Sequence, residues 1–124
     1  MSKKHLAINW LDKPAKHDYE AAESYLSLLF DVTAVARHVK KLRRAQMREF
    51  KAKDLLRASG LSRLGVSNSH VERDREKIVK GDALSPILLI RDGKNDKLII
   101  ADGYHRLCAV YSFDEDATIP SRII

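Results

Sequence analysis

The chain has 124 residues, of which 44% are hydrophobic and 32% are charged, a composition typical of a protein with one modest core. Its net charge is +6, and no run reaches the roughly 18 apolar residues that a membrane helix needs. The single cysteine, Cys108, excludes an internal disulfide, and the five histidines show no metal-ligand spacing. We therefore expect a cytoplasmic protein with no membrane partner and no metal centre.

Taken in chain order, residues 1–49 are predicted to be a helical N-terminal extension within a single domain, 1–124. Asp18 is a candidate N-cap for a helix over 19–30. The helix would bury one apolar face made of Tyr19, Ala22, Tyr25, Leu26 and Leu29. A second helix over 33–46 would bury Val35, Val39 and Leu42. A homo-oligomer formed through these helices is an open alternative.

Positive charge is concentrated between Arg37 and Arg57. This segment has nine basic residues against Glu49 and Asp54, a net charge of +7, so the rest of the chain carries −1. A basic helix in the segment 37–57 predicts a partner such as a nucleic acid or an acidic protein. The alternative is a solvated helix face that keeps a small protein soluble.

The remaining residues, 50–124, are predicted to form an α+β core with a small mixed sheet. Its first elements are a short strand over 50–53 and a short helix over 54–59 that ends at Gly60. Ser69 and Glu72 match a capping box, in which each side chain accepts a hydrogen bond from the other residue's backbone. The helix that they open would end at Gly81 and bury Val71, Ile78 and Val79.

The continuous apolar run 86–90 predicts a buried strand, and turn residues from Asp92 to Asp96 connect it to a second strand over 98–101. These two strands are expected to pair as a hairpin. A helix over 104–112 and a last strand over 119–124 complete the predicted core.

The most informative stretch is Asp102-Gly103-Tyr104-His105-Arg106, where a buried strand turns sharply into a helix. The first backbone N–H groups of that helix would be unpaired and favour an anion. Gly103 would let a ligand approach closely. A cation at Arg106 opposes the helix dipole, and a phosphate bound between it and the helix would remove that conflict. In the alternative, Asp102 is a plain N-cap and Arg106 pairs with Asp102 or with the acidic residues of 114–116.

This stretch resembles the Gly-x-His-Arg turn of the ParB/sulfiredoxin superfamily, and Pro86-Ile87-Leu88-Leu89 is similar to the strand that precedes the turn in that family. The resemblance covers about residues 50–124 and implies a ParB/sulfiredoxin kind of fold. It also implies a bound nucleoside triphosphate or diphosphate, such as ATP or CTP, with Mg²⁺ as an optional companion. The residues that would hold the phosphates are Gly103, Tyr104, His105, Arg106 and Arg73. Tyr104 stands where sulfiredoxin has its reactive cysteine, so sulfinic acid reduction is not expected.

Three functions are open at this point. The first is a nucleotide-binding domain, and the second is a phosphotransferase that acts on a small molecule such as a free amino acid. Small ParB-like proteins with a similar turn include free-serine kinases. In an enzyme the candidate catalytic residues are Glu72, Asp102 and His105, because phosphoryl transfer needs a carboxylate and positive charge at the phosphates. The third is a protein-binding or nucleic-acid-binding module that uses the basic helix within 37–57.

Overall fold

The computed structural model describes residues 7–124, so residues 1–6 of the predicted N-terminal extension lie outside the described residues. The helices are α1 (Lys16–Leu26), α2 (Val32–Arg44), α3 (Ala52–Ser59), α4 (Ser69–Lys80) and α5 (Tyr104–Phe113), and the strands are β1 (Met47–Lys51), β2 (Ile87–Asp92), β3 (Lys97–Asp102) and β4 (Thr118–Ile123). The α+β class is confirmed. The ParB/sulfiredoxin kind stays a prediction.

The four strands form one mixed sheet in the order β1-β4-β2-β3. The β2–β3 pair is the predicted antiparallel hairpin, β1 pairs with β4 antiparallel, and β2 pairs with β4 parallel. The predicted boundary between 49 and 50 falls inside β1, which begins at Met47. The N-terminal part of the chain therefore contributes an edge strand to the sheet as well as two helices.

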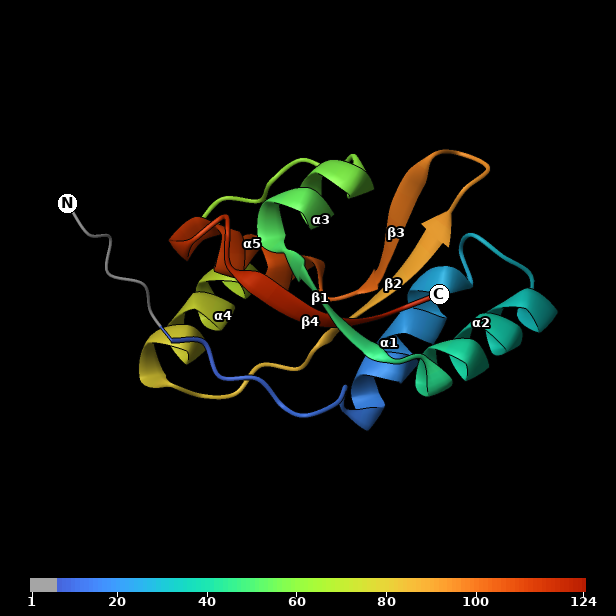
Figure 1. Ribbon diagram of the computed structural model, residues 1–124, viewed down its shortest axis with the longest axis horizontal. Helices are drawn as coiled ribbons and strands as arrows, with labels where there is room; N and C mark the ends of the chain where they lie inside the picture. Colours follow the sequence, from blue (N-terminus) through green and yellow to red (C-terminus); the bar gives the residue numbers. More distant parts are fainter. Residues whose placement is uncertain (1–6) are drawn as a thin grey trace.

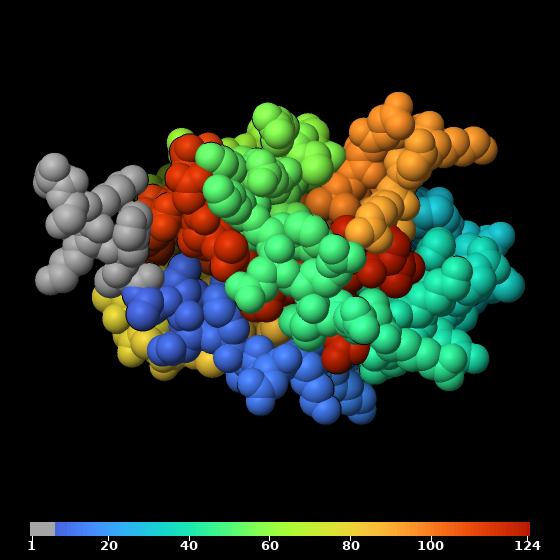
Figure 2. Space-filling view, in the orientation of Figure 1, coloured from blue at the N-terminus to red at the C-terminus, as the bar shows by residue number. Residues whose placement is uncertain are grey.

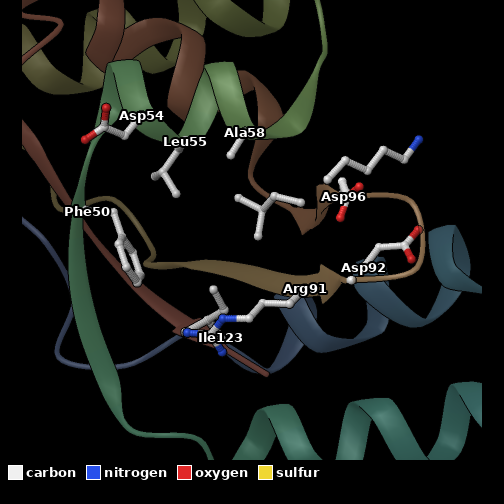
Figure 3. Close-up of a pocket in the computed structure, with 11 residues that line it drawn as sticks. Phe50, Asp54, Leu55, Ala58, Arg91, Asp92, Asp96 and Ile123 are labelled. Atoms are coloured by element: carbon white, nitrogen blue, oxygen red, sulfur yellow. The ribbon is translucent and has the colours of Figure 1, made fainter.

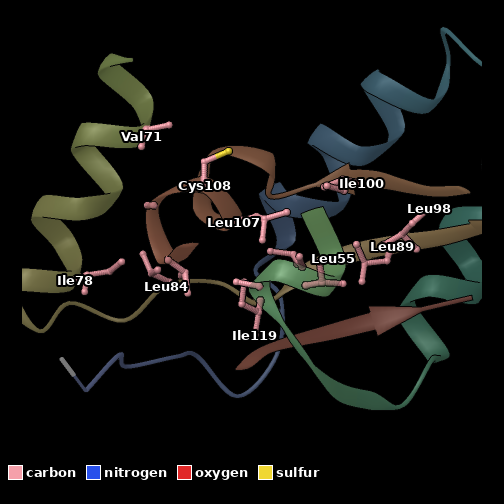
Figure 4. Close-up of a cluster of buried hydrophobic side chains, with 14 residues drawn as sticks. Leu55, Val71, Ile78, Leu84, Leu89, Leu98, Ile100, Leu107, Cys108 and Ile119 are labelled. Carbon is pink, nitrogen blue, oxygen red and sulfur yellow. The ribbon is translucent and has the colours of Figure 1, made fainter. Parts of the chain in front are cut away.

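Helices cover both faces of the sheet, which explains why β2 and β3 are almost continuously apolar (Figure 1). On one face, Leu89 of β2 and Ile100 of β3 pack in a cluster with α3, α4 and α5, in which Leu55 and Leu107 meet the strands (Figure 4). On the other face, alternate strand residues pack against α1 and α2. They are Leu88, Ile90, Ile99 and Ala101.

The first predicted helix is displaced toward the N-terminus. It runs from Lys16 to Leu26, so Asp18 lies inside its first turn and the prediction that Asp18 is the N-cap is wrong. The carboxylate of Asp18 instead accepts a hydrogen bond from the backbone N–H of the N-cap residue Ala15 at 2.8 Å. A side chain in the first turn thus provides the acceptor for this backbone group. Tyr25 and Leu29, predicted to be inward, are 43% and 50% exposed. Leu29 lies beyond the end of the helix at Leu26.

The second helix agrees with its prediction, because Val35, Val39 and Leu42 are all buried. The basic helix expected within 37–57 is not one helix. The segment passes through the C-terminal half of α2, then β1, then α3. Its charges are thus distributed over three elements of different geometry.

The start of α4 differs from the predicted capping box. The N-cap is Asn68, whose side-chain oxygen accepts hydrogen bonds from the N–H groups of His70 and Val71 at 3.0 and 3.2 Å. Ser69 is the first helical residue, so the Ser69–Glu72 box is wrong. Val71 and Ile78 are buried as predicted, whereas Val79 is 65% exposed, since it lies about 80–100° around the helix from those two residues.

Replacing Asn68 by alanine is expected to lower the free energy of unfolding by about 1 kcal/mol, because two amides of α4 lose their acceptor. Ser69→Ala is the matched control and should change it by less than about 0.5 kcal/mol. Urea denaturation followed by circular dichroism measures both values. A larger loss for Ser69→Ala than for Asn68→Ala would instead support the predicted Ser69–Glu72 capping box.

Candidate functional site

The candidate site is built around the junction of β3 and α5. Gly103 caps α5 with a φ of 111°, and the first intrahelical bond runs from the N–H of Leu107 to the carbonyl of Gly103 at 2.9 Å. No described side chain caps the amides of Tyr104, His105 and Arg106. The N-terminal end of α5 therefore keeps the partial positive charge of the helix dipole without a protein acceptor.

Gly103 is required at this position by its surroundings. A Cβ there would lie 2.2 Å from Cγ2 and 2.6 Å from Cβ of Ile87, at the start of β2. β2 also has an irregular register between Leu88 and Leu89 where it passes Asp102. The turn is thus held directly against the neighbouring strand.

Arg106 does not lie as the anion-binding interpretation requires. Its Nη2 donates to Oδ2 of Asp102 at 2.7 Å, and the same nitrogen lies 3.7 Å from Oδ1 of Asp18. Internal carboxylates therefore balance its charge, so the inference that a phosphate must neutralise this guanidinium is wrong. The alternative ion pair with Asp102 is the one formed. Asp102 itself does not cap α5, because Gly103 is the N-cap and makes no side-chain hydrogen bond.

Asp18 and Asp102 form a carboxyl pair around this single guanidinium. The side chain of Asp18 is 2% exposed and that of Asp102 is 14% exposed. Burial raises the pKa of Asp102 to about 6, and the negative charge of Asp18 adds to the rise, although Arg106 lowers it. The cluster joins α1 to the turn. Nothing local in the sequence marks Asp18 as part of the site.

A pair of histidines brings the N-terminal ends of α4 and α5 together. His70 is the second residue of α4 and His105 is the second residue of α5, and their ring centroids are 4.8 Å apart. Burial lowers the pKa of His105, as do His70 and Arg106, while Asp74 opposes them. Two helix dipoles and two imidazoles thus meet at one place, although the amides of His70 and Val71 are already capped by Asn68.

The carboxylate that faces this pair from α4 is Asp74. Asp74 lies four residues after His70, so the two side chains share one face of α4. Burial raises the pKa of Asp74, and the cations Arg106 and Lys77 partly offset that rise. Glu72 lies about 160° around the helix from His70 and sits 3.7 Å from Arg75, so the structure does not bring it to the turn. Arg73 is exposed on α4, about 60° from His70.

The loop between α3 and α4 covers the other side of α5. The hydroxyl of Tyr104 donates to the carbonyl of Ser62, and the N–H of Leu64 lies 3.4 Å from Sγ of Cys108. Burial raises the pKa of both Tyr104 and Cys108. The Tyr104 side chain is therefore engaged by the loop, and only its backbone N–H remains for a ligand.

A separate groove of ≈ 420 Å³ lies between α3 and the β2–β3 hairpin (Figure 3). Its floor is apolar and includes Phe50 and Leu55. Two cations and three carboxylates line it, namely Arg91, Lys97, Asp54, Asp92 and Asp96. Because the acidic groups outnumber the basic ones, this groove is a poorer place for a phosphate than the end of α5.

Within residues 7–124, no group of three or more His, Cys, Asp or Glu side chains is arranged to hold a metal ion. None of the helices in that range combines the length and the hydropathy that crossing a bilayer requires.

The structure brings together Gly103, His105 and the backbone of Tyr104 and Arg106, and it leaves Glu72 apart. It adds three residues to the site that sequence reasoning missed, Asp18, His70 and Asp74. His70 could have been found from its place in the first turn of a predicted helix and Asp74 from its spacing of four residues after His70, whereas Asp18 has no such local signal. Comparisons with protein-family models, with curated proteins and with solved structures give no match to this chain.

Proposed function

We propose that the chain binds the phosphate groups of a nucleotide at the N-terminal end of α5. The observation that carries this proposal is the meeting of two helix N-termini, each with a histidine at its second position, at a turn whose helix has no side-chain cap. Unpaired amides and cationic side chains together are what a phosphate prefers. The resemblance of the turn to the ParB/sulfiredoxin superfamily points to the same chemistry.

In this proposal each residue has a defined role. The backbone amides of Tyr104, His105 and Arg106 donate to phosphate oxygens, and the positive φ of Gly103 permits the sharp turn that presents them. His70, His105 and the exposed Arg73 supply positive charge. The guanidinium of Arg106 acts as a positioning group, since its bond to Asp102 ties the first turn of α5 to the end of β3.

The nucleotide is a triphosphate or diphosphate such as ATP or CTP. A cytoplasmic location is part of the proposal, because nucleotides are abundant there and the buried free thiol of Cys108 suits a reducing compartment.

Isothermal titration calorimetry with tripolyphosphate, ATP, CTP and ADP tests the proposal. His105→Gln and His70→Gln are each expected to weaken binding about 10- to 100-fold, because each removes one charge-assisted hydrogen bond. Arg73→Gln should weaken it less, since Arg73 is exposed. Lys80→Gln removes a cation from the other end of α4 and should leave the affinity unchanged.

The pH dependence supplies an independent check. The pKa of His105 is lowered in the free protein, and a bound anion favours the charged imidazole, so binding takes up a proton. Affinity should therefore rise as the pH falls from 7.5 toward 6, by more in the wild type than in His105→Gln. No binding of any polyphosphate, or equal affinities for Lys80→Gln and His105→Gln, would refute the site.

A second candidate is phosphoryl transfer to a small hydroxyl-bearing acceptor such as a free amino acid. The specific observation is that Asp74 faces His105 with a raised pKa, as a general base would. Asp74 is also the carboxylate that would share Mg²⁺ with nucleotide phosphates, because Asp102 is engaged by Arg106. Incubation with ATP and free amino acids should then yield ADP in the wild type and none in Asp74→Asn, whereas Glu72→Gln should stay active.

A further inference from the structure

Helix α2 has two faces of opposite character. Val35, Val39 and Leu42 are buried against the sheet. At 100° per residue, four exposed cations lie within an arc of about 100° on the opposite side. These are Arg37, Lys40, Lys41 and Arg44. The helix has no acidic residue between Val32 and Arg44.

The structure divides the basic segment 37–57 into a paired part and an unpaired part. In α3 and at its start, Lys51 and Lys53 lie 4.0 and 2.6 Å from Asp116, and Arg57 lies 3.9 Å from Asp54. Arg43 stacks on the ring of Tyr19 at 4.4 Å. Among residues 7–124, no carboxylate side chain lies within ion-pair distance of the four cations of the α2 arc or of Arg48 in β1.

These five cations without an ion-pair partner are hereafter called the α2–β1 basic corner, and three of them, Lys41, Arg44 and Arg48, line a cleft. The cleft has a volume of ≈ 370 Å³ and is lined by Lys41, Arg44, Ala45, Gln46, Arg48, Ile123 and Ile124. In Figure 2 the red C-terminal residues are visible between the teal of α2 and the green of β1, and these elements form one continuous band with α3. The lining contains three cationic side chains and no acidic one.

The titration of a neighbouring side chain is consistent with this concentration of charge. Burial lowers the pKa of His38, and Arg37 and Lys41 lower it further. Packed against the same helix turn is the ring of Phe30, at 4.7 Å from the His38 ring. These two cations of the arc therefore disfavour a further positive charge at His38.

We propose that the α2–β1 basic corner binds the phosphate backbone of a double-stranded nucleic acid, independently of the nucleotide site at α5. From Arg37 to Arg44 the helix rises about 10 Å, and a duplex presents about six phosphate charges over that length. Four of the five cations fall within this length, and Arg48 of β1 adds a fifth at the cleft. No aromatic side chain lines the cleft on which an unpaired base would stack, which favours a duplex over a single strand and predicts binding without sequence preference.

Fluorescence anisotropy with a short labelled DNA duplex of mixed sequence tests this proposal on the full chain. With five phosphate contacts, affinity should fall about 500-fold between 50 and 200 mM salt. The triple variant Lys41→Ala/Arg44→Ala/Arg48→Ala should keep two contacts and fall only about 12-fold over the same range. Its affinity at 50 mM salt should also be lower than that of the wild type.

The matched control is Lys51→Ala/Lys53→Ala/Arg57→Ala, which removes the same net charge from the paired part of the segment. This control should keep the wild-type salt dependence, and so should the charge-preserving variant Lys41→Arg/Arg44→Lys/Arg48→Lys. An equal loss in both alanine triples would overturn the proposal, because net charge alone would then explain binding. Tighter binding to single strands, to polyglutamate or to anionic lipid vesicles than to the duplex would overturn it as well.

Discussion

Gly103→Ala is expected to lower the free energy of unfolding by about 3–5 kcal/mol, measured by urea denaturation. Two costs combine. An alanine at a φ of 111° is strained by about 1–3 kcal/mol. Its Cβ would also lie 2.2 Å from Cγ2 of Ile87, which adds an overpacking cost of about 1–3 kcal/mol. Ile87 is fully buried in a central strand, so it cannot move away without displacing packed neighbours.

Gly60→Ala provides the control. Gly60 also has a positive φ, of 68°, but an added Cβ would have no atom within 4 Å. The expected loss is about 1 kcal/mol, which is the cost of the left-handed conformation alone. Equal losses for the two variants would show that β2 shifts to make room for the added Cβ at little cost. The close contact with Ile87 would then not explain why residue 103 is a glycine.

Arg106→Met is expected to cost about 3–5 kcal/mol at pH 7, because it leaves the carboxyls of Asp18 and Asp102 buried without their counter-charge. The loss should shrink as the pH falls. The pKa of Asp102 is already raised to about 6 with Arg106 present, and removing the cation raises it further. A proton then binds the folded state more tightly than the unfolded one, so between pH 7 and pH 5 the variant gains stability as protons are added.

Two further variants separate the parts of this effect. Arg106→Met/Asp102→Asn has no titratable group at 102, and the recovery at low pH should largely disappear. Arg57→Met breaks an exposed ion pair with Asp54 and should change the free energy of unfolding by less than about 0.5 kcal/mol. A loss in Arg106→Met that stays constant from pH 7 to pH 5 would mean that the two buried carboxyls are not held by this guanidinium.

The cluster also has a functional consequence. Asp18 belongs to α1 and Asp102 ends β3, so Arg106 links the N-terminal helix to the turn that precedes the proposed phosphate site. The helices predicted to be an extension are therefore bound to the site by charge as well as by packing. We expect their position and the geometry of the turn to depend on each other.

Local patterns in the sequence were sufficient for much of the fold. The apolar run 86–90 and the following turn residues predicted the β2–β3 hairpin, and Gly60 and Gly81 predicted the ends of α3 and α4. The buried face of α2 followed from helical periodicity. These features depend on neighbours within a few residues, and side-chain pattern and backbone preference determine them directly.

The composition of the site depended on contacts that no local pattern contains. Arg106 meets the nearby carboxylate of Asp102 at 2.7 Å, and Asp18, a residue 88 positions earlier that α1 carries to the turn, adds a second carboxylate at 3.7 Å. Packing of α4 against α5 set His70 and Asp74 beside His105 and left Glu72 outside.

The same holds for the basic segment. The order of residues is enough to concentrate positive charge between 37 and 57. Which of these cations are paired depends on the folded chain, because the carboxylate of Asp116 comes from the turn before β4 and lies 2.6 Å from Lys53. Electrostatic attraction depends on distance in space, and the fold sets those distances.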